Sequence, residues 1–287
     1  MKTRLAWLIA LFASSLFGQG DSATLAAYLN ELRHMNPVQR EAAFDSTEFQ
    51  KTAAHRREIE ETVFKPLLTG DLALYIDTLK AGMNDADPYI KQYTASLVSL
   101  IATNPEVYLV PNSARVRALA TLVPSLIALT DEIESDDVRT TALGSLARIV
   151  STGDPSITVT FKKALNDKDA RVRGAGLFGL AWVPQEQSVV LEEALRFLRS
   201  DPDLSNRKLA ASILSEIAIN DSRILSALIT SINDPSAEVQ QVAVSALYER
   251  GHGNKAVLQV LEKKLAQPGL DQSVRLQIER EMKVQEQ

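Results

Sequence analysis

The chain of 287 residues contains no cysteine, although 45% of its residues are hydrophobic. Disulfide bonds are therefore excluded, and so is a bacterial lipoprotein anchor, because that lipid is attached to a cysteine. A chain with this much apolar material does not need disulfide staples, since its core is large enough to hold the fold.

Aromatic residues and positive charge are also scarce. Phe, Trp and Tyr together make up 6% of the sequence, and the formal net charge is −5. A core built from Ala and Leu favours helices over a β-sandwich, which draws on aromatic and β-branched residues. Nucleic-acid binding depends on clustered Lys and Arg, so the acidic balance argues against such a partner.

The N-terminus has the layout of a secretory signal peptide. Residues 1–4 form a short basic start, and residues 5–17 are apolar or small throughout. Gly18 and Gly20 then stand at the −3 and −1 positions of a cut before Asp21. This order of segments predicts a signal peptide over residues 1–20.

The apolar run from Leu5 to Phe17 has 13 residues, whereas a membrane span needs about 20. We expect cleavage, which would remove Lys2 and Arg4 and take the net charge from −5 to −7. The protein would then be periplasmic or secreted in a bacterium, with no stable membrane anchor. A signal that is retained as an anchor is the alternative.

A repeat of about 34 residues is the strongest pattern in the chain. One position of each unit, the anchor, is separated from the next by 33 to 35 residues. The anchors are Val138, Val172, Asn206, Val239 and Val274. Four residues after each anchor the side chain is small or apolar, and eight residues after it the side chain is apolar. This spacing is typical of one buried helix face.

Turn residues divide each unit into two helices. An aspartate stands five residues before three of the anchors, at Asp167, Asp201 and Asp234. First helices are expected to start near the following residues: Leu72, Arg115, Ile157, Val189, Arg223 and Ala256. An earlier unit is anchored at Ile90, 48 residues before Val138, so an insertion is expected over residues 104–113.

Residues 21–70 lack the repeat and are predicted to form an N-terminal helical cap. One helix is expected from Ser22 to about Met35, and a second from Asp45 to about Phe64, stopped near Pro66 and Gly70. Residues 71–287 would then form an array of about five to six units. The whole is an all-α fold, an α-solenoid of stacked antiparallel helix pairs.

The order of aspartate, short turn, Val-Arg, and then Ala and Leu at helical spacing resembles HEAT repeats, in particular the short HEAT-like units of bacterial proteins. The resemblance covers about residues 71–287. It implies a superhelix whose second helices line the concave side. It implies little about function, because such arrays serve many unrelated roles.

Two motifs that suggest chemistry fall at fixed repeat positions. Residues 174–179 match the dinucleotide fingerprint GxGxxG, but they lie inside an expected helix and not after a strand, so we interpret the glycines as sites of close helix packing. The paired aspartates lack the glycine and the closing glutamate of a calcium loop. We interpret them as helix caps that pair with the basic residue one position after the anchor, forming a ladder. Asn206 replaces the usual apolar anchor, and a local distortion is expected there.

Four aromatic residues of the second helices are candidate partner-binding residues. They are Tyr93, Phe178, Trp182 and Tyr248, and their offsets from the anchors place them beside the apolar stripe. Tyr and Trp dominate binding hot spots, so we predict that these residues contact a protein or peptide. The alternative is that these residues fill gaps between repeats or cap the end of a helix, as expected of Trp182 before Pro184.

The predicted function is that of an exported, non-enzymatic scaffold that binds a partner protein or peptide on the curved face of the array. No cofactor, metal or catalytic residue is expected; His34, His55 and His252 are far apart and have no metal-ligand spacing. Two alternatives stay open: an enzyme or small-ligand module with a site spread over several repeats, and a structural subunit of an envelope complex.

Overall fold

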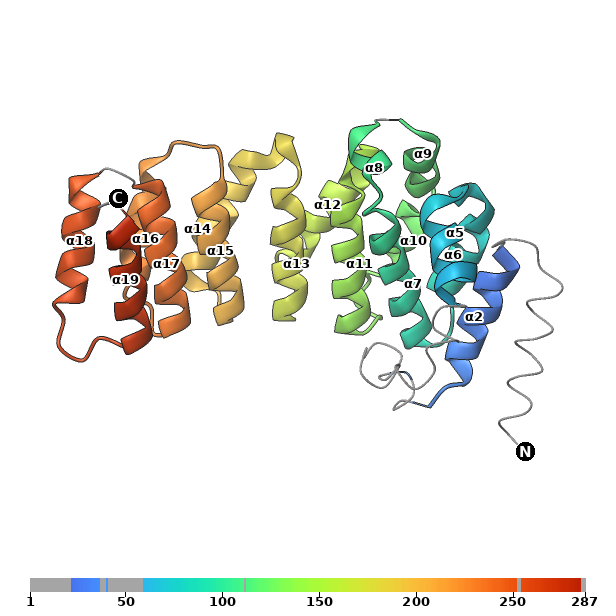
Figure 1. The fold of residues 1–287 in the computed structure, drawn as a ribbon, viewed down its shortest axis with the longest axis horizontal. Coiled ribbons are helices and arrows are strands. Elements are labelled where there is room, and N and C mark those ends of the chain that lie inside the picture. The colour runs from blue at the N-terminus through green and yellow to red at the C-terminus, as the bar shows by residue number, and fades with distance from the viewer. Residues whose placement is uncertain (1–21, 37–39, 41–58, 111, 252–253, 285–287) are drawn as a thin grey trace. The chain divides into compact units, whose positions relative to one another are not determined.

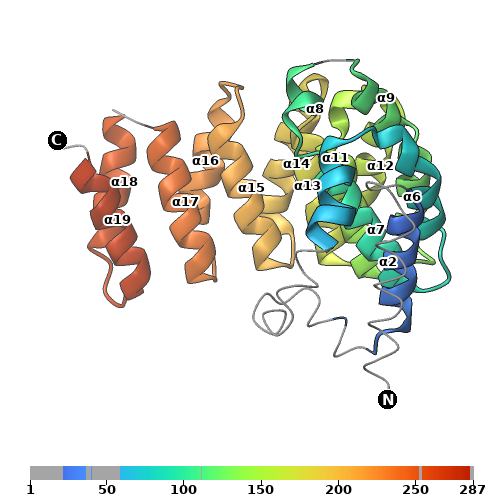
Figure 2. The same cartoon turned by 45° about the vertical axis from the view of Figure 1, so that its right-hand side comes forward.

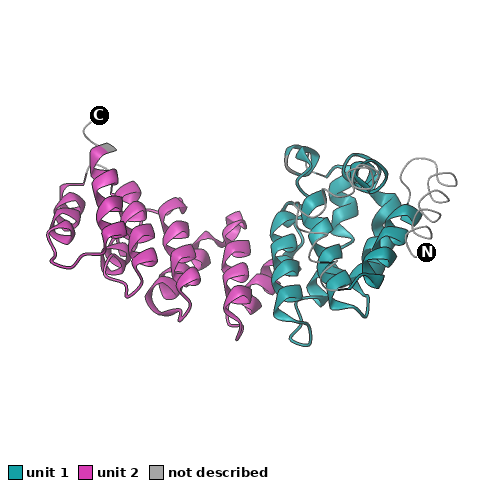
Figure 3. Cartoon of the chain, turned by 60° about the horizontal axis from the view of Figure 1, so that its bottom comes forward, with its two compact units in different colours: residues 1–157 teal, residues 158–287 magenta. Residues whose placement is uncertain are grey.

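The computed structural model describes residues 22–36, 40, 59–110, 112–251 and 254–284. The predicted signal peptide and most of the predicted second cap helix lie outside these residues. Within the described part the regular structure is helical, with no strand, which confirms the predicted all-α solenoid (Figure 1). The chain falls into two compact units, unit 1 (residues 1–157) and unit 2 (residues 158–287), which are described separately (Figure 3).

Unit 1 begins with α2 and contains two helix pairs. Its elements, in chain order, are α2 (Ser22–His34), the π-helical turn η2 (Glu60–Phe64), α5 (Lys65–Thr69), the 3-10 turn η3 (Leu72–Tyr75), α6 (Ile76–Met83), α7 (Pro88–Ile101), α8 (Pro105–Leu109), α9 (Ala114–Ala120), α10 (Val123–Ala128), α11 (Asp136–Arg148) and η4 (Val150–Thr152). The predicted insertion contains α8. The first helix of the second pair is broken into α9 and α10.

Unit 2 continues the pattern with more regular pairs. Helix α12 (Pro155–Ala164) starts just before the division between the units. It is followed by α13 (Ala170–Ala181), η5 (Pro184–Glu186), α14 (Gln187–Ser200), α15 (Leu204–Glu216), α16 (Ser222–Ser231), α17 (Ala237–Arg250), α18 (Lys255–Leu265) and α19 (Gln272–Val284). The helices begin within one or two residues of the positions expected from the sequence.

The second helices of unit 2 form one layer, and the first helices form another. Helix α15 packs against α13 and α17, and α17 packs against α19 (Figures 1 and 2). We call α13, α15, α17 and α19 the second-helix layer. The anchors Val172, Val239 and Val274 are buried between the layers, as the repeat pattern predicts.

The paired aspartates cap the second helices. Asp167 accepts a hydrogen bond from the backbone N–H of Asp169, and Asp169 accepts one from that of Arg171, at 2.8 and 2.9 Å. Asp201 and Asp203 repeat this arrangement one unit later. A carboxylate at this position satisfies the free N–H groups of the first helical turn. The predicted capping role is therefore confirmed.

The predicted ladder of ion pairs links successive units. The Nε and Nη2 groups of Arg173 donate to the two carboxylate oxygens of Asp201, and those of Arg207 donate to Asp234, at distances of 2.8 to 3.0 Å. In unit 1, Lys91 forms an ion pair with Glu134. Each cation reaches forward to an acid at the start of the next second helix, so the ladder fixes the stacking register.

The glycines of the GxGxxG motif are packing sites, as the helical interpretation predicted. A Cβ atom on Gly176 would lie 2.8 Å from the Cβ of Ala164, and one on Gly179 would lie 2.3 Å from the ring of Phe161. Both neighbours belong to α12, which approaches α13 closely at these two points. A nucleotide-binding loop is not formed, because the motif is helical throughout.

The distortion expected at Asn206 is not present. Helix α15 is regular there, and Asn206 is buried. Its Nδ2 donates to the carbonyl of Ala170 at 2.9 Å, and its side chain occupies the space left by Gly174, where a Cβ would meet Oδ1 at 2.4 Å. The polar anchor is thus accommodated by a hydrogen bond and a neighbouring glycine.

Helix α2 packs against the first helix pair of unit 1, on α6 and α7. The hydroxyl groups of Tyr28 and Tyr93 are 3.0 Å apart, and Arg33 and Arg40 form ion pairs with Asp85 and Asp87. These contacts agree with a capping role for α2. The predicted division at residues 20 and 70 stays a prediction.

The helix stop predicted near Pro66 and Gly70 is found at Gly70 and not at Pro66. Helical structure continues from η2 into α5 and ends at Gly70. Pro66 lies in the first turn of α5, where its missing N–H leaves fewer helical hydrogen bonds unmade than it would in the interior. Among the described residues, no helix combines the length and apolar character needed to cross a membrane.

Candidate binding surfaces

Two of the four predicted aromatic residues are buried. Tyr93 and Tyr248 each have only 7% of their surface exposed. Tyr93 packs edge-to-face on Tyr28 and stacks on Tyr89, and burial raises its pKa above the ordinary range for tyrosine. Their low exposure favours the alternative role of packing between repeats, and partner contact by Tyr93 and Tyr248 stays a prediction. A tyrosine three or nine residues after an anchor lies between helices, because those positions face the neighbouring unit.

The other two aromatic residues are exposed and lie together. Phe178 is 39% exposed and Trp182 is 59% exposed, and their ring centroids are 6.0 Å apart at an angle of 71°. They are four residues apart and therefore share one face of α13. Edge-to-face contact between the rings stabilises the pair without covering it. We call these two residues the aromatic pair.

The contacts of neighbouring second helices indicate what surrounds the aromatic pair. Offsets are counted from each unit's anchor. The Nε2 atom of Gln277, at offset +3 of α19, donates a hydrogen bond to the Oγ atom of Ser245, at offset +6 of α17, at 2.8 Å. The same register places Phe178, at offset +6 of α13, beside offset +3 of α15, which is Leu209. The half-buried Leu209 side chain does lean toward α13, where it comes within 3.9 Å of a Cβ built on Gly174. An apolar side chain of α15 therefore lies near α13, the helix that carries the aromatic pair.

Trp182 is held in place by the end of its helix. Its backbone N–H donates to the carbonyl of Gly179 at 3.2 Å, and it forms the C-cap of α13. The chain then turns through η5, where Glu186 binds Lys162 of α12 at 2.8 Å. The indole is therefore presented from a fixed backbone and exposes its apolar surface without a loop having to order.

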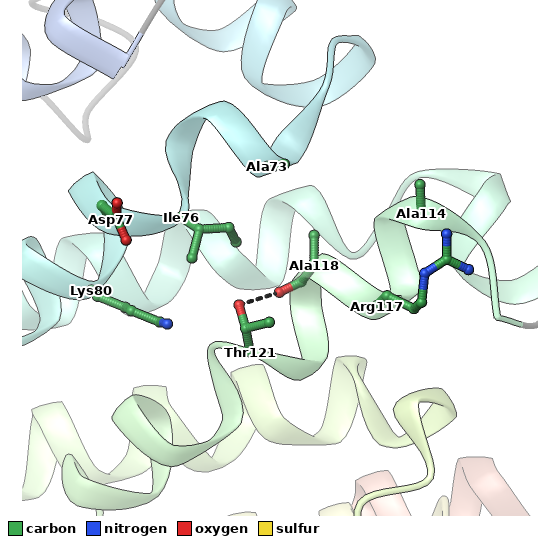
Figure 4. Close-up of a pocket in the computed structure, with 8 residues that line it drawn as sticks. All are labelled: Ala73, Ile76, Asp77, Lys80, Ala114, Arg117, Ala118 and Thr121. Atoms are coloured by element: carbon green, nitrogen blue, oxygen red, sulfur yellow. Dashed lines mark hydrogen bonds between the residues drawn. The ribbon is translucent and has the colours of Figure 1, made fainter.

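The second candidate surface is hollowed and lies in unit 1, between first helices of the repeat. Two adjoining hollows of about 430 and 470 Å³ lie between α6 on one side and α9 and α10 on the other. Both are open to solvent, and Lys80 lines both. The walls include the small side chains of Ala73, Ala114 and Ala118 (Figure 4). We call this surface the α6–α9 groove. Sequence reasoning missed it, because it lies where the first helix of the second pair is broken into α9 and α10.

Arg115 fixes the position of α9, which forms one wall of the groove. Arg115 is buried, and its guanidinium donates to the carbonyl of Gly70 at 2.6 Å and lies 3.7 Å from a carboxylate oxygen of Glu106 in α8. Because one arginine ties α9 both to the end of α5 and to the insertion, the spacing between α6 and α9 is set by fixed contacts.

Groups suited to metal or acid–base chemistry do not gather in the described part of the chain. There, no three or more His, Asp and Glu side chains are close enough to hold a metal ion. His34 binds the carbonyl of Asn30 at 2.7 Å, whereas His55 and His252 lie outside the described residues. Lys264 is buried, which lowers its pKa, and it donates to Asn233 at 3.0 Å.

Comparison with known proteins supports the repeat assignment. Residues 191–283 match the family model for HEAT repeats. No curated protein matches the sequence at a significant level. Among solved structures, the Escherichia coli protein YibA is similar to the chain, with a TM-score of 0.55 and 19% identity, over 86% of this chain and 82% of that one.

Designed repeat proteins are similar as well. A designed armadillo repeat protein in complex with the peptide (KR)4 gives a TM-score of 0.51 and 18% identity, over 72% of this chain and 98% of that one. At such identities the likeness concerns the fold. The predicted resemblance is thus confirmed: the chain is a HEAT-like α-solenoid whose residues 191–283 carry the HEAT-repeat signature.

Proposed function

We propose that this chain is a non-enzymatic scaffold that binds a partner protein or peptide through the second-helix layer of unit 2. The exposure of the aromatic pair carries the proposal. Phe178 and Trp182 leave much of two large apolar side chains in water. Covering such surface is favourable at about 25 cal/mol per Å², and Trp is prominent in binding hot spots.

The type of fold supports the same proposal. Stacked helices present a row of equivalent side chains, which suits an extended partner that crosses several units. The designed armadillo protein cited above was solved with the peptide (KR)4, so a solenoid of this general architecture can hold a peptide. The peptide chemistry of that design is not transferred to this chain, because the likeness is one of fold.

The test substitutes the aromatic pair and follows binding and folding separately. We expect Trp182→Ala, alone and with Phe178→Ala, to lower recovery of stoichiometric partners after crosslinking in the native host by about tenfold or more. Leu276→Ala is the matched control, because Leu276 is 55% exposed on α19 of the same layer. Thermal melting should stay within a few degrees of wild type for all variants. Unchanged recovery with Trp182→Ala would contradict the proposal.

An enzyme or ligand-binding module and a structural envelope subunit are the alternatives. A small molecule or metal that stays bound in native mass spectrometry would favour the former. A fixed complex that survives Trp182→Ala would favour the latter. We further propose that the chain is exported by its first 20 residues, which supplies a periplasmic or secreted location for the partner.

A further inference from the structure

The repeat places a cation near the end of several first helices, ten residues before the anchor. The residues at this position include Lys80, Lys162, Arg196 and Lys264. In unit 2 each of these side chains has a partner. Lys162 binds Glu186 at 2.8 Å, Arg196 binds the carbonyl of Leu165 at 3.3 Å, and Lys264 binds Asn233 at 3.0 Å. Within unit 2, the cation at this position links one repeat to the next.

Lys80 of unit 1 departs from this use. It forms no hydrogen bond or ion pair with any residue that the structure describes, and it is only half-buried. It lines both hollows of the α6–α9 groove, at the point where they meet, and Figure 4 shows it facing Thr121 across the groove. The equivalent cations of unit 2 link one repeat to the next, whereas Lys80 is directed into an open groove.

The charge around Lys80 defines what the groove fits. Arg117 adds a second cation on the opposite wall and donates to the carbonyl of Asn112, whereas Asp77 is the acid on the α6 wall. These three side chains give the groove a net positive charge, whereas unit 1 as a whole is acidic. Residues 158–287 contain 17 basic and 17 acidic side chains, so the net charge of −5 lies entirely in unit 1. An acidic ligand is repelled by most of this unit and attracted here.

The shape of the groove favours a peptide over a small molecule. A pocket for a small ligand covers most of the ligand's surface, whereas both hollows are open along their length. The small side chains of Ala73, Ala114 and Ala118 let a backbone approach closely. We propose that the α6–α9 groove binds a peptide segment of a partner protein through an acidic side chain that pairs with Lys80. This site is separate from the aromatic pair and does not depend on it.

The test uses the full chain, immobilised, and a phage-displayed library of random peptides. Peptides selected on the wild-type chain are counter-selected against Ala114→Trp, which fills the groove from an exposed position. We expect the peptides lost on Ala114→Trp to be enriched in Asp and Glu. Thermal melting checks the fold of Ala114→Trp, and Thr121→Trp, also at an exposed groove position, serves if that variant unfolds.

The charge pairing is then measured with one selected peptide by fluorescence anisotropy. Lys80→Gln should weaken binding by about tenfold, Lys80→Arg should retain most of it, and Asp77→Asn should strengthen it, because a competing carboxylate is removed. Lys163→Gln makes the same charge change on α12 of unit 2 and should leave Kd unchanged. The proposal is overturned if the selected peptides lack acids, or if Lys80→Gln and Lys163→Gln behave alike. Trp182→Ala leaves this binding intact, so the outcome is independent of the aromatic pair.

Discussion

Single residues of this chain have roles that depend on the helix facing them. Gly176 and Gly179 of α13 lie against α12, where a Cβ would collide with Ala164 or Phe161. Gly144, near the middle of α11, meets no atom within 4 Å of such a Cβ. The same residue type is therefore required by packing at two helical positions and is only tolerated at the third.

This contrast gives a prediction with an internal control. Gly179→Ala should lower the free energy of unfolding by about 1–3 kcal/mol, because the ring of the fully buried Phe161 has little room to move. Gly144→Ala should leave the free energy unchanged or raise it by up to about 1 kcal/mol, because alanine is the better helix former. Urea denaturation measures both. Equal effects of the two substitutions would show that the close approach of α12 and α13 is not as described.

At the scale of elements, the turn before each second helix combines capping with the ladder. Asp201 accepts hydrogen bonds from the backbone N–H of Asp203 and from the Nε and Nη2 groups of Arg173. Burial by itself would raise the pKa of Asp201, but the hydrogen bonds from Arg173, Asp203 and Asn206 outweigh it and hold the pKa below its ordinary value of 3.8. A single carboxylate thus links α13 to α15.

The lowered pKa of Asp201 makes the free energy of unfolding depend on pH in the acidic range. Its folded-state pKa lies below the unfolded value, so its contribution is complete above about pH 4 and is lost as the pH falls through the folded-state pKa. Asp201→Asn should lower the free energy of unfolding by about 1–3 kcal/mol at neutral pH and flatten its decline below about pH 4. Denaturation curves across this pH range test the prediction. An unchanged acid slope would assign the acid sensitivity to other carboxylates.

At the scale of the whole molecule, two compact units each contain their own helix pairs and a different candidate surface. Unit 1 has the α6–α9 groove, and unit 2 has the aromatic pair. The two surfaces also lie on different elements of the repeat, first helices in unit 1 and second helices in unit 2. Under the two proposals made above, each surface would bind its own partner segment.

Export is also a property of the whole chain. If residues 1–20 are a signal peptide, the mature protein begins at Asp21 and carries a net charge of −7. N-terminal sequencing of the protein from the periplasm or medium tests this directly. A protein that keeps Met1 and stays in the cytosol would contradict it, whereas one that keeps Met1 in the membrane fraction would indicate a retained anchor.

The sequence by itself determined the period, the helix starts, the caps and the ladder, because these depend on residues close together in the chain or at fixed repeat spacing. Asp167, Arg173 and their equivalents could be assigned in this way. The tertiary structure decided which side chains remain in water. Tyr93 and Tyr248 are buried by neighbouring helices, whereas Phe178 and Trp182 are not. The groove at Lys80 likewise depends on how α9 and α10 lie against α6. Burial and cavities arise from contacts between elements, and the distances between those elements are not contained in a local pattern.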